Sequence, residues 1–278
     1  MEYSPKKMND ILEQNNFNFK KKFGQNFIVD ENIINSIVTK SLIDKETLVI
    51  EIGPGAGSLT AKLAESSKQV LCYEIDTTLK EILNENLKQY NNVDIIYQDF
   101  LEADVINDIK KYNYNKLYIV ANLPYYITTP IIINVIEKKL NVDKMVVMVQ
   151  KEVGDRFKAN VGTKDYNSLS IYLNYYFNVK KIMDISRNIF IPKPNVDSIV
   201  VEFTKKENSY NLKNEELFFK LIRDSFTQKR KTIRNNLKNY DLNTIEEILK
   251  KHNQDLNTRA EQITIETFVE IANNLTTI

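Results

Sequence analysis

The chain has 278 residues, of which 42% are hydrophobic and 27% are charged. This composition is that of a globular protein with a substantial core, and it excludes wholesale disorder. A single His (His252) and a single Cys (Cys72) are too few for structural zinc or a multi-histidine metal centre. No apolar run approaches the roughly 20 residues of a membrane span, and no targeting segment is visible. We therefore expect a cytoplasmic protein with no metal and no membrane association.

Strands and helices alternate through the first two thirds of the chain. Residues 1–22 are polar, and we expect a flexible tail with a short helix near 8–14. After an expected helix at 31–38, the expected strands are 47–52, 69–75, 93–98, 116–121 and 144–149, and the expected helices between them are 58–65, 77–87 and 129–137. Such alternation is typical of a parallel sheet with helices on both faces.

The pattern changes after Tyr166. A helix over 168–176 precedes two strands, 180–185 and 196–204, which indicate a closing hairpin and hence one antiparallel strand. Beyond a polar linker at 205–210 the pattern is helical only, with a capping-box pattern at Asn243 and Glu246. The sequence predicts a Rossmann-like α/β domain with a seven-stranded sheet over 23–206 and a small all-helical domain over 207–278.

A glycine-rich turn follows the first buried strand. The segment E-I-G-P-G-A-G places Gly53, Gly55 and Gly57 between that strand and the next helix. Glycines there let a ligand lie against the backbone. The dinucleotide fingerprint requires a glycine at position 58, where this chain has serine. Taken alone, the turn is as consistent with a tight structural turn as with a ligand site.

Two acids at later strand ends make a ligand site the better interpretation. Glu74 closes the second strand, where a ribose-binding acid belongs in this topology, and Asp99 lies just past the third. Both are expected at the carboxyl edge of the sheet, beside the glycine turn. A ribose diol suits Glu74 and an adenine amine suits Asp99, so the set fits S-adenosylmethionine at least as well as NAD.

The tetrapeptide N-L-P-Y follows the fourth strand at the same edge. The Asn122 side-chain oxygen and the Leu123 carbonyl are two acceptors for the hydrogens of an exocyclic base amine. Pro124 restricts the backbone, and Tyr125 offers a ring face for stacking and for developing positive charge on nitrogen. This set predicts methyl transfer to a nucleobase amine without a general base.

Charge is unevenly distributed although the net charge is only +1. Residues 220–238 contain seven basic side chains and one acidic one, whereas 239–278 contain three basic and seven acidic ones. Such segregation indicates a surface that faces a polyanion, although a solvated helix face would also account for it. We expect a helix on which Ile233 and Leu237 face inward while the basic side chains Lys229, Arg230, Lys231 and Arg234 cover the remaining faces toward the polyanion. Arg223, one helix earlier, extends this patch. Lys20, Lys21 and Lys22 are expected at the other rim of this surface.

With these motifs in place, the sequence resembles the adenine-specific ribosomal RNA dimethyltransferases of the KsgA type. The motifs that carry the resemblance, from Phe23 to about Leu237, are F-G-Q-N-F, E-I-G-P-G-A-G, Y-E-I-D, Q-D-F, N-L-P-Y-Y-I-T-T-P, V-Q-K-E-V, F-I-P-K-P-N-V-D-S and Q-K-R-K-T-I-R-N-N-L. The last motif is similar to the small-subunit enzymes and not to the large-subunit resistance methyltransferases.

The resemblance implies the cofactor, the site residues and the substrate. S-adenosylmethionine would be contacted by Asn26, Ile28, Gly53, Glu74, Asp99 and Asn122. Phe190 would be a second aromatic beside the target base, although a packing anchor explains it equally well. The implied reaction is dimethylation of two adjacent adenosines in a loop near the 3′ end of small-subunit ribosomal RNA, by a monomer acting on the assembling subunit. The alternatives are methylation of large-subunit ribosomal RNA or DNA, and a non-catalytic assembly or transcription factor that keeps the fold.

Overall fold

The computed structural model describes residues 5–15, 17–207 and 210–275. The chain forms two compact units. The sheet unit comprises the described residues up to 154 together with 180–205, and the helical unit comprises 155–179 and the described residues from 206 onward. Segment 155–179, which the sequence analysis grouped with the sheet, therefore lies with the C-terminal helices. None of the described helices is both long and apolar enough to cross a membrane.

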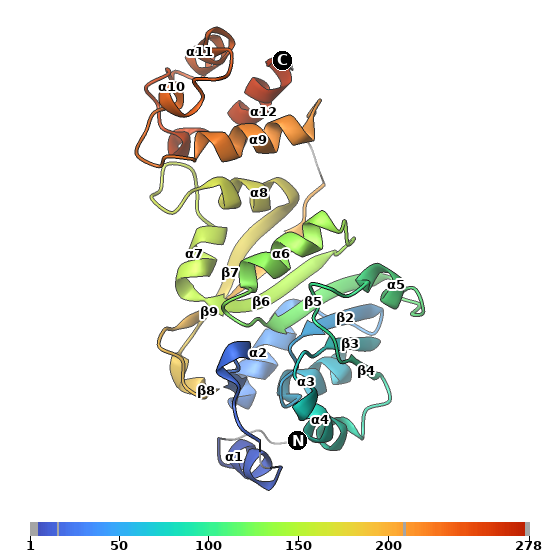
Figure 1. Ribbon diagram of the computed structural model, residues 1–278. Helices are drawn as coiled ribbons and strands as arrows, with labels where there is room; N and C mark the ends of the chain where they lie inside the picture. Colours follow the sequence, from blue (N-terminus) through green and yellow to red (C-terminus); the bar gives the residue numbers. More distant parts are fainter. Residues whose placement is uncertain (1–4, 16, 208–209, 276–278) are drawn as a thin grey trace. The chain divides into compact units, whose positions relative to one another are not determined.

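Seven strands form the main sheet (Figure 1). They are β2 (Thr47–Ile52), β3 (Gln69–Tyr73), β4 (Val93–Ile96), β5 (Lys116–Asn122), β6 (Lys144–Gln150), β7 (Phe177–Ile185) and β9 (Ser198–Lys205), in the spatial order β4-β3-β2-β5-β6-β9-β7. The pairs from β4 to β6 are parallel, and β9 runs antiparallel to β6. The prediction of a Rossmann-like, mostly parallel sheet is confirmed.

Helices cover the sheet because its central strands are apolar on both faces. All six residues of β2 are buried. The helices of this unit are α2 (Glu31–Ser41), α3 (Ser58–Ser66), α4 (Lys80–Leu87), α5 (Val105–Ile109) and α6 (Thr128–Glu137), with short 3-10 turns at Thr77–Leu79 and Arg187–Ile189. Apolar side chains of α2 and α3 share one buried cluster with Val49, Val70 and Val120 of the strands. Strand order reverses between β2 and β5, so a ligand crevice is expected at the carboxyl ends of these two strands.

The segment before β2 packs onto the sheet unit. Helix α1 (Pro5–Gln14) buries Met8 and Leu12 in a cluster with Leu79, Ile82 and Leu83. After the 3-10 turn Lys21–Phe23, strand β1 (Phe27–Ile28) pairs antiparallel with β8 (Phe190–Ile191). The described part of the expected flexible tail is thus anchored, because an amphipathic helix brings two apolar side chains onto α4.

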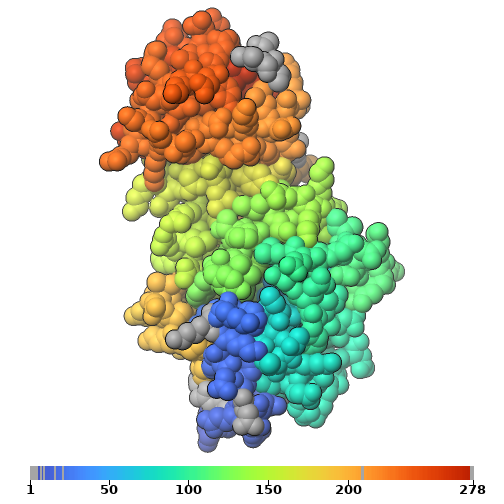
Figure 2. Space-filling view, in the orientation of Figure 1, coloured from blue at the N-terminus to red at the C-terminus, as the bar shows by residue number. Residues whose placement is uncertain are grey.

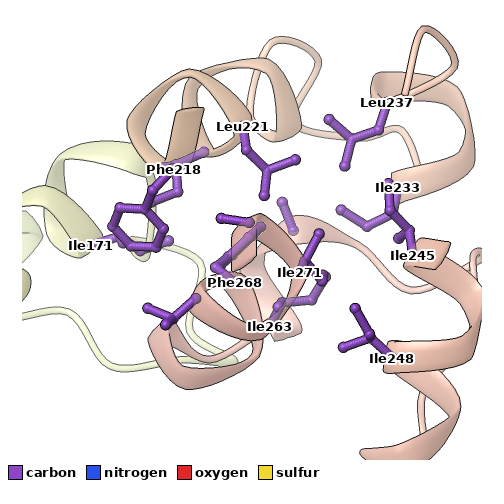
Figure 3. Close-up of a cluster of buried hydrophobic side chains, with 14 of the residues drawn as sticks. Ile171, Phe218, Leu221, Ile233, Leu237, Ile245, Ile248, Ile263, Phe268 and Ile271 are labelled. Atoms are coloured by element: carbon purple, nitrogen blue, oxygen red, sulfur yellow. The ribbon is translucent and has the colours of Figure 1, made fainter. Parts of the chain in front are cut away.

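The helical unit has its own core (Figure 3). It contains α8 (Ser168–Tyr176), α9 (Glu215–Ser225), α10 (Ile233–Asn236), α11 (Leu242–Lys251), the 3-10 turn Ala260–Gln262 and α12 (Ile265–Asn274), while α7 (Lys151–Phe157) spans the boundary between the units. Ile233 and Leu237 are fully buried and pack with Phe218 and Phe268, as the inward face predicted for them requires. This core also includes Ile171 of α8.

Two details of the helical unit differ from the predictions. Lys229, Arg230 and Lys231 lie in a turn before α10 and not on the helix, which starts only after Thr232. The turn is held by the Asn236 side chain, which donates to the carbonyl oxygen of Ser225 at 2.6 Å. Helix α11 is capped by Asp241, whose carboxylate accepts from two backbone N–H groups, and not by the predicted Asn243.

Candidate active site

One pocket gathers most of the predicted site residues at the carboxyl edge of the sheet. Including the part open to solvent, it encloses about 940 Å³, enough for a nucleoside-sized ligand. The predicted residues that line it are Asn26, Ile28, Gly53, Gly55, Glu74, Asp99, Asn122, Leu123, Pro124 and Tyr125. Segments separated by about 100 positions in the sequence therefore meet around a single site.

The glycine turn between β2 and α3 forms the floor of this pocket. Gly55 has a φ of 59°, and a Cβ there would come within 2.8 Å of the Phe27 ring. Gly57 has a φ of 84° and is the N-cap of α3; it does not line the pocket. Any side chain at position 55 would collide with Phe27 and fill the space that the turn leaves to a ligand.

Glu74 follows β3 and is only 4% exposed. Its two carboxylate oxygens accept backbone N–H groups from Gly55 at 3.2 Å and Asp76 at 2.8 Å. Burial raises the pKa of this carboxyl to about 7. Its fixed orientation and remaining acceptor capacity suit the two hydroxyls of a ribose.

Asp99 lies on the pocket wall after β4. Its Oδ1 accepts the backbone N–H of Leu101 at 2.9 Å, which holds the carboxylate in an Asx turn. Ile75, which is 42% exposed, and buried Phe100 line the same wall. The combination of a carboxylate acceptor and apolar side chains suits an adenine ring.

Asn122 ends β5 and connects the N-terminal segment to the sheet edge. Its amide Nδ2 donates to the backbone carbonyl of Asn26 at 2.8 Å, and the Asn26 amide donates to the carbonyl of Gly24 at 2.9 Å. Because the Asn122 nitrogen makes this contact, its Oδ1 is the part that remains as an acceptor for a ligand.

The turn after Asn122 is rigid. The carbonyl oxygen of Pro124 accepts from the Ile127 backbone and the Thr128 hydroxyl, at 3.2 and 3.1 Å. The Tyr125 hydroxyl lies 2.8 Å from Ser198 Oγ. A hydrogen bond at the ring's far end and a tight turn at its backbone fix the Tyr125 ring at the pocket.

Phe190 does not join this pocket. It is 2% exposed, lies in β8 opposite Ile28, and belongs to the buried cluster beneath the sheet. The pairing of β8 with β1 holds it there. This arrangement agrees with the packing role that the sequence left open for Phe190.

The structure adds contacts around Asp76 that the sequence analysis did not predict, including one to Lys20, which was expected only at the rim of the basic surface. Lys20 Nζ lies 2.5 Å from Asp76 Oδ1, and Gln25 Nε2 donates to the other oxygen of Asp76 at 2.7 Å. Asp76 is 1% exposed; although burial alone raises its pKa, the bonds from Lys20, Thr78 and Gln25 hold it below its ordinary value. These contacts fasten the N-terminal segment over the pocket, and in Figure 2 that segment, in blue, lies against the cyan residues after the glycine turn. The motif Y-E-I-D contains Asp76, but its ion-pair partner Lys20 lies 56 positions earlier in the sequence, so the motif alone could not predict the contact.

Glu51 is a second buried carboxyl of the pocket that was not selected. It is 1% exposed, interrupts the apolar run of β2, and lies 3.7 Å from the Cys72 sulfur. Burial raises its pKa to about 8. The sequence feature that could have pointed to Glu51 is an acidic residue within a strand of otherwise apolar residues.

The predicted RNA-binding side chains are all exposed on the helical unit. Arg223 lies on α9, Arg234 on α10, and Lys229, Arg230 and Lys231 on the turn between them. The Lys229 ammonium donates to the carbonyl oxygen of Lys164. Within the described part of the chain, no group of three or more His, Cys, Asp or Glu side chains is arranged to hold a metal ion.

Comparison with known proteins assigns the family. A family model described as ribosomal RNA adenine dimethylase matches residues 16–277. A "Ribosomal RNA small subunit methyltransferase A" of Staphylococcus aureus is 48% identical over 85% of this chain and 81% of its own, and that of Macrococcus caseolyticus is 45% identical over 99% and 97%. Among solved structures, a dimethyladenosine transferase from Plasmodium falciparum has a TM-score of 0.73 at 25% identity, covering 88% of this chain and 95% of its own. The protein therefore belongs to the ribosomal RNA adenine dimethylase family.

Proposed function

We propose that this protein transfers methyl groups from S-adenosylmethionine to the exocyclic amines of two adjacent adenosines in a loop near the 3′ end of small-subunit ribosomal RNA. The observation that carries the proposal is the position of the Asn122–Tyr125 turn, which lies in the same pocket as Glu74 and the glycine turn. Relatives that cover nearly the whole chain are named small-subunit methyltransferases.

Three parts of the pocket are assigned to the cofactor, which supplies the methyl group when bound. Glu74 accepts the ribose hydroxyls, Asp99 accepts the adenine amine, and the glycine turn lets the ligand approach the backbone. Asn26, through its contact with Asn122, joins the N-terminal segment to this site, and Ile28 adds an apolar wall.

The Asn122–Tyr125 turn prepares the attacking amine. The lone pair of an adenine amine is delocalised into the ring, so the amine is a poor nucleophile until its nitrogen becomes pyramidal. The Asn122 Oδ1 and the Leu123 carbonyl accept its two hydrogens and orient the lone pair toward the methyl group. The Tyr125 ring stacks on the base and favours the positive charge that grows on nitrogen. A base must leave its helix to reach this pocket, so the target is an unpaired loop.

The helical unit is the proposed RNA-binding domain. We assign catalysis to the sheet unit and RNA orientation to the helical unit, with Arg223, Lys229, Arg230, Lys231 and Arg234 on phosphates. The protein is proposed to act as a cytoplasmic monomer on the assembling small subunit.

Primer extension on small-subunit ribosomal RNA tests this function. This RNA and, in parallel, large-subunit ribosomal RNA are incubated with protein in the presence and absence of S-adenosylmethionine, and Asn122→Ala serves as the control variant. We expect cofactor-dependent stops at two neighbouring adenosines near the 3′ end, strongly reduced with the variant. Stops only in large-subunit RNA, or none in either RNA, would overturn the proposal.

A further inference from the structure

A second tyrosine at the pocket, Tyr126, has no part in the chemistry assigned to its neighbour Tyr125. Tyr126 lines the pocket but is 54% exposed, whereas Tyr125 is largely buried and bonded to Ser198. Single exposed aromatic residues are common on proteins, so exposure alone carries no argument. Tyr126 differs from an ordinary exposed aromatic residue in the side chains and backbone that surround it.

Tyr126 is supported from behind by the N-terminal segment. A Cβ built on Gly24 would lie 3.2 Å from Cδ1 of Tyr126, so the ring rests directly on the backbone of a glycine whose φ is 58°. The amide of Asn26 holds the Gly24 carbonyl, and Asn122 holds Asn26. The ring is therefore a supported aromatic surface at the pocket mouth, with a large part of its area left to solvent.

A cation lies on the segment that supports this ring, two residues before Gly24. Gly24 follows Phe23, which also lines the pocket, and the exposed Lys22 places its ammonium 4.6 Å from the centre of the Phe23 ring. The nearby Lys20 is neutralised by its ion pair with Asp76. An exposed aromatic ring, supported by a segment that also carries a lysine, is the combination that single-stranded nucleic acid sites use for a base and its phosphate.

We propose that Tyr126 and Lys22 form a subsite for the nucleotide next to the target adenosine, with the base stacked on Tyr126 and its phosphate at Lys22. The inference rests on the proposed function, because it takes the target base to occupy the pocket at Tyr125. One phosphate joins adjacent nucleotides, so a base drawn into the pocket brings its neighbour to the mouth. The site would then recognise an unpaired dinucleotide step and not a single base.

Binding to loop RNAs with and without the neighbouring base tests the subsite. The parent probe is an RNA hairpin whose loop contains two adjacent adenosines; two further hairpins lack the base at one or the other adenosine. Affinities are measured by fluorescence anisotropy with saturating S-adenosylhomocysteine. The wild-type protein is expected to bind the parent about tenfold more tightly than either abasic hairpin. Tyr126→Ala should remove this preference, and Tyr126→Phe should keep it.

Matched variants separate the subsite from other roles. Lys22→Ala should weaken binding of all three hairpins and lower the salt dependence, whereas Lys68→Ala, an exposed lysine elsewhere on the sheet unit, should change neither. Tyr126→Ala should leave the affinity for S-adenosylhomocysteine unchanged.

Two outcomes overturn the inference. One is equal wild-type affinity for the parent and abasic hairpins; the other is a Tyr126→Ala protein that keeps the preference or loses only cofactor affinity. Methyl transfer to the parent hairpin tests the proposed function separately. Transfer without base preference rejects the subsite alone, and absence of both binding and transfer rejects both proposals.

Discussion

At the scale of single residues, the proposed role of Glu74 as ribose acceptor makes cofactor binding depend on pH. Burial raises its pKa from 4.5 to about 7, so part of the free protein carries a neutral carboxyl at neutral pH. Two ribose hydroxyls need an acceptor, so binding favours the ionised form. Affinity for S-adenosylmethionine should therefore rise about tenfold between pH 6 and pH 8. Calorimetric titrations of wild type and Glu74→Gln across this range measure the effect, and the variant should bind more weakly with a flatter profile. Equal profiles would contradict the role of Glu74.

The raised pKa of Glu74 affects folding stability in the opposite direction: stability decreases as the pH rises. Between pH 4.5 and about 7 the folded protein holds a proton on Glu74 that the unfolded chain has released. The free energy of unfolding of the ligand-free protein should therefore fall as pH rises through this window. Glu51, with a pKa of about 8, extends the decline to higher pH. Urea denaturation of wild type and Glu51→Gln at pH 5 and pH 8 should show a smaller decline for the variant, and an equal decline would contradict this account.

Asn122 is expected to matter more for turnover than for RNA affinity. In the proposed mechanism its Oδ1 accepts a hydrogen of an amine that becomes pyramidal only as the reaction proceeds, so the interaction is stronger in the transition state. Asn122→Ala should lower kcat by about tenfold or more while the Kd for RNA changes little. Single-turnover methylation and RNA binding measured on the same preparations distinguish the two effects. An equal loss in both would assign Asn122 to substrate binding instead.

The Tyr125 ring, and not its hydroxyl, should account for its contribution. The hydroxyl oxygen lies at hydrogen-bond distance, 2.8 Å, from Ser198 Oγ. The ring face is therefore the part of Tyr125 that can contact the base. Tyr125→Phe should keep most activity, whereas Tyr125→Ala removes a stacking surface of about 1–3 kcal/mol. Methylation rates of the two variants are compared after circular dichroism has shown normal folding. An inactive Phe variant would assign the hydroxyl a direct role.

At the scale of elements, the segment from α1 to β1 is fastened by Asp76. Its buried carboxylate accepts from Lys20 and Gln25, while its own N–H donates to Glu74. Asp76→Ala removes the charged hydrogen bonds to Lys20 and Gln25, each worth about 1.5–3 kcal/mol when buried, and so frees the segment that brings Asn26 and Ile28 to the pocket. The backbone N–H to Glu74 remains. Cofactor affinity should fall about tenfold or more, and trypsin should cleave faster at Lys20–Lys22. Lys62→Ala, which breaks the ion pairs of this α3 lysine with Glu31 and Glu65, is the control and should change neither. Unchanged proteolysis of Asp76→Ala would show that the segment is held by its apolar contacts alone.

The elements that sequence could predict are those set by local pattern. Buried strands alternating with helices define a parallel sheet, and each predicted strand of the main sheet is present within a few residues of its bounds. The pairing of β1 with β8 could not be predicted, because it joins two-residue strands more than 160 positions apart. The turn at 229–231 was also missed, since its geometry depends on the contact between Asn236 and Ser225.

In the candidate site, too, local sequence patterns predict some features, whereas others depend on contacts between distant segments. Motifs at strand ends placed Glu74, Asp99 and Asn122 together because parallel strands bring their carboxyl ends to one edge. The attachments of Asp76 to Lys20 and Gln25 depend on the path of a loop, and the burial of Phe190 depends on the β1–β8 pair. Local patterns carry no information on either.

At the scale of the whole molecule, we propose that the sheet unit captures the base and the helical unit orients the RNA. The exposed cations of the helical unit lie on a turn and two helices whose apolar residues fill a separate core, so they can be removed without disturbing the pocket. A protein that neutralises phosphates releases counterions, so the slope of log affinity against log salt measures the number of contacts. Replacing Lys229, Arg230 and Arg234 together by Ala should therefore weaken RNA binding and flatten this slope by about one unit per lost contact.

A matched triple variant shows whether the loss of RNA binding depends on the position of the removed charges or only on their number. Lys213, Lys250 and Lys251 lie on the same unit outside the basic turn, and the last two form ion pairs with Glu246 and Glu270. Replacing these three by Ala removes the same charge, yet the salt slope should stay close to that of wild type. Cofactor affinity should be unchanged in both triple variants, because neither set lines the pocket. Equal losses in the two variants would mean that RNA responds to the net charge of the unit, and unchanged RNA affinity in the first would leave the basic turn without a role.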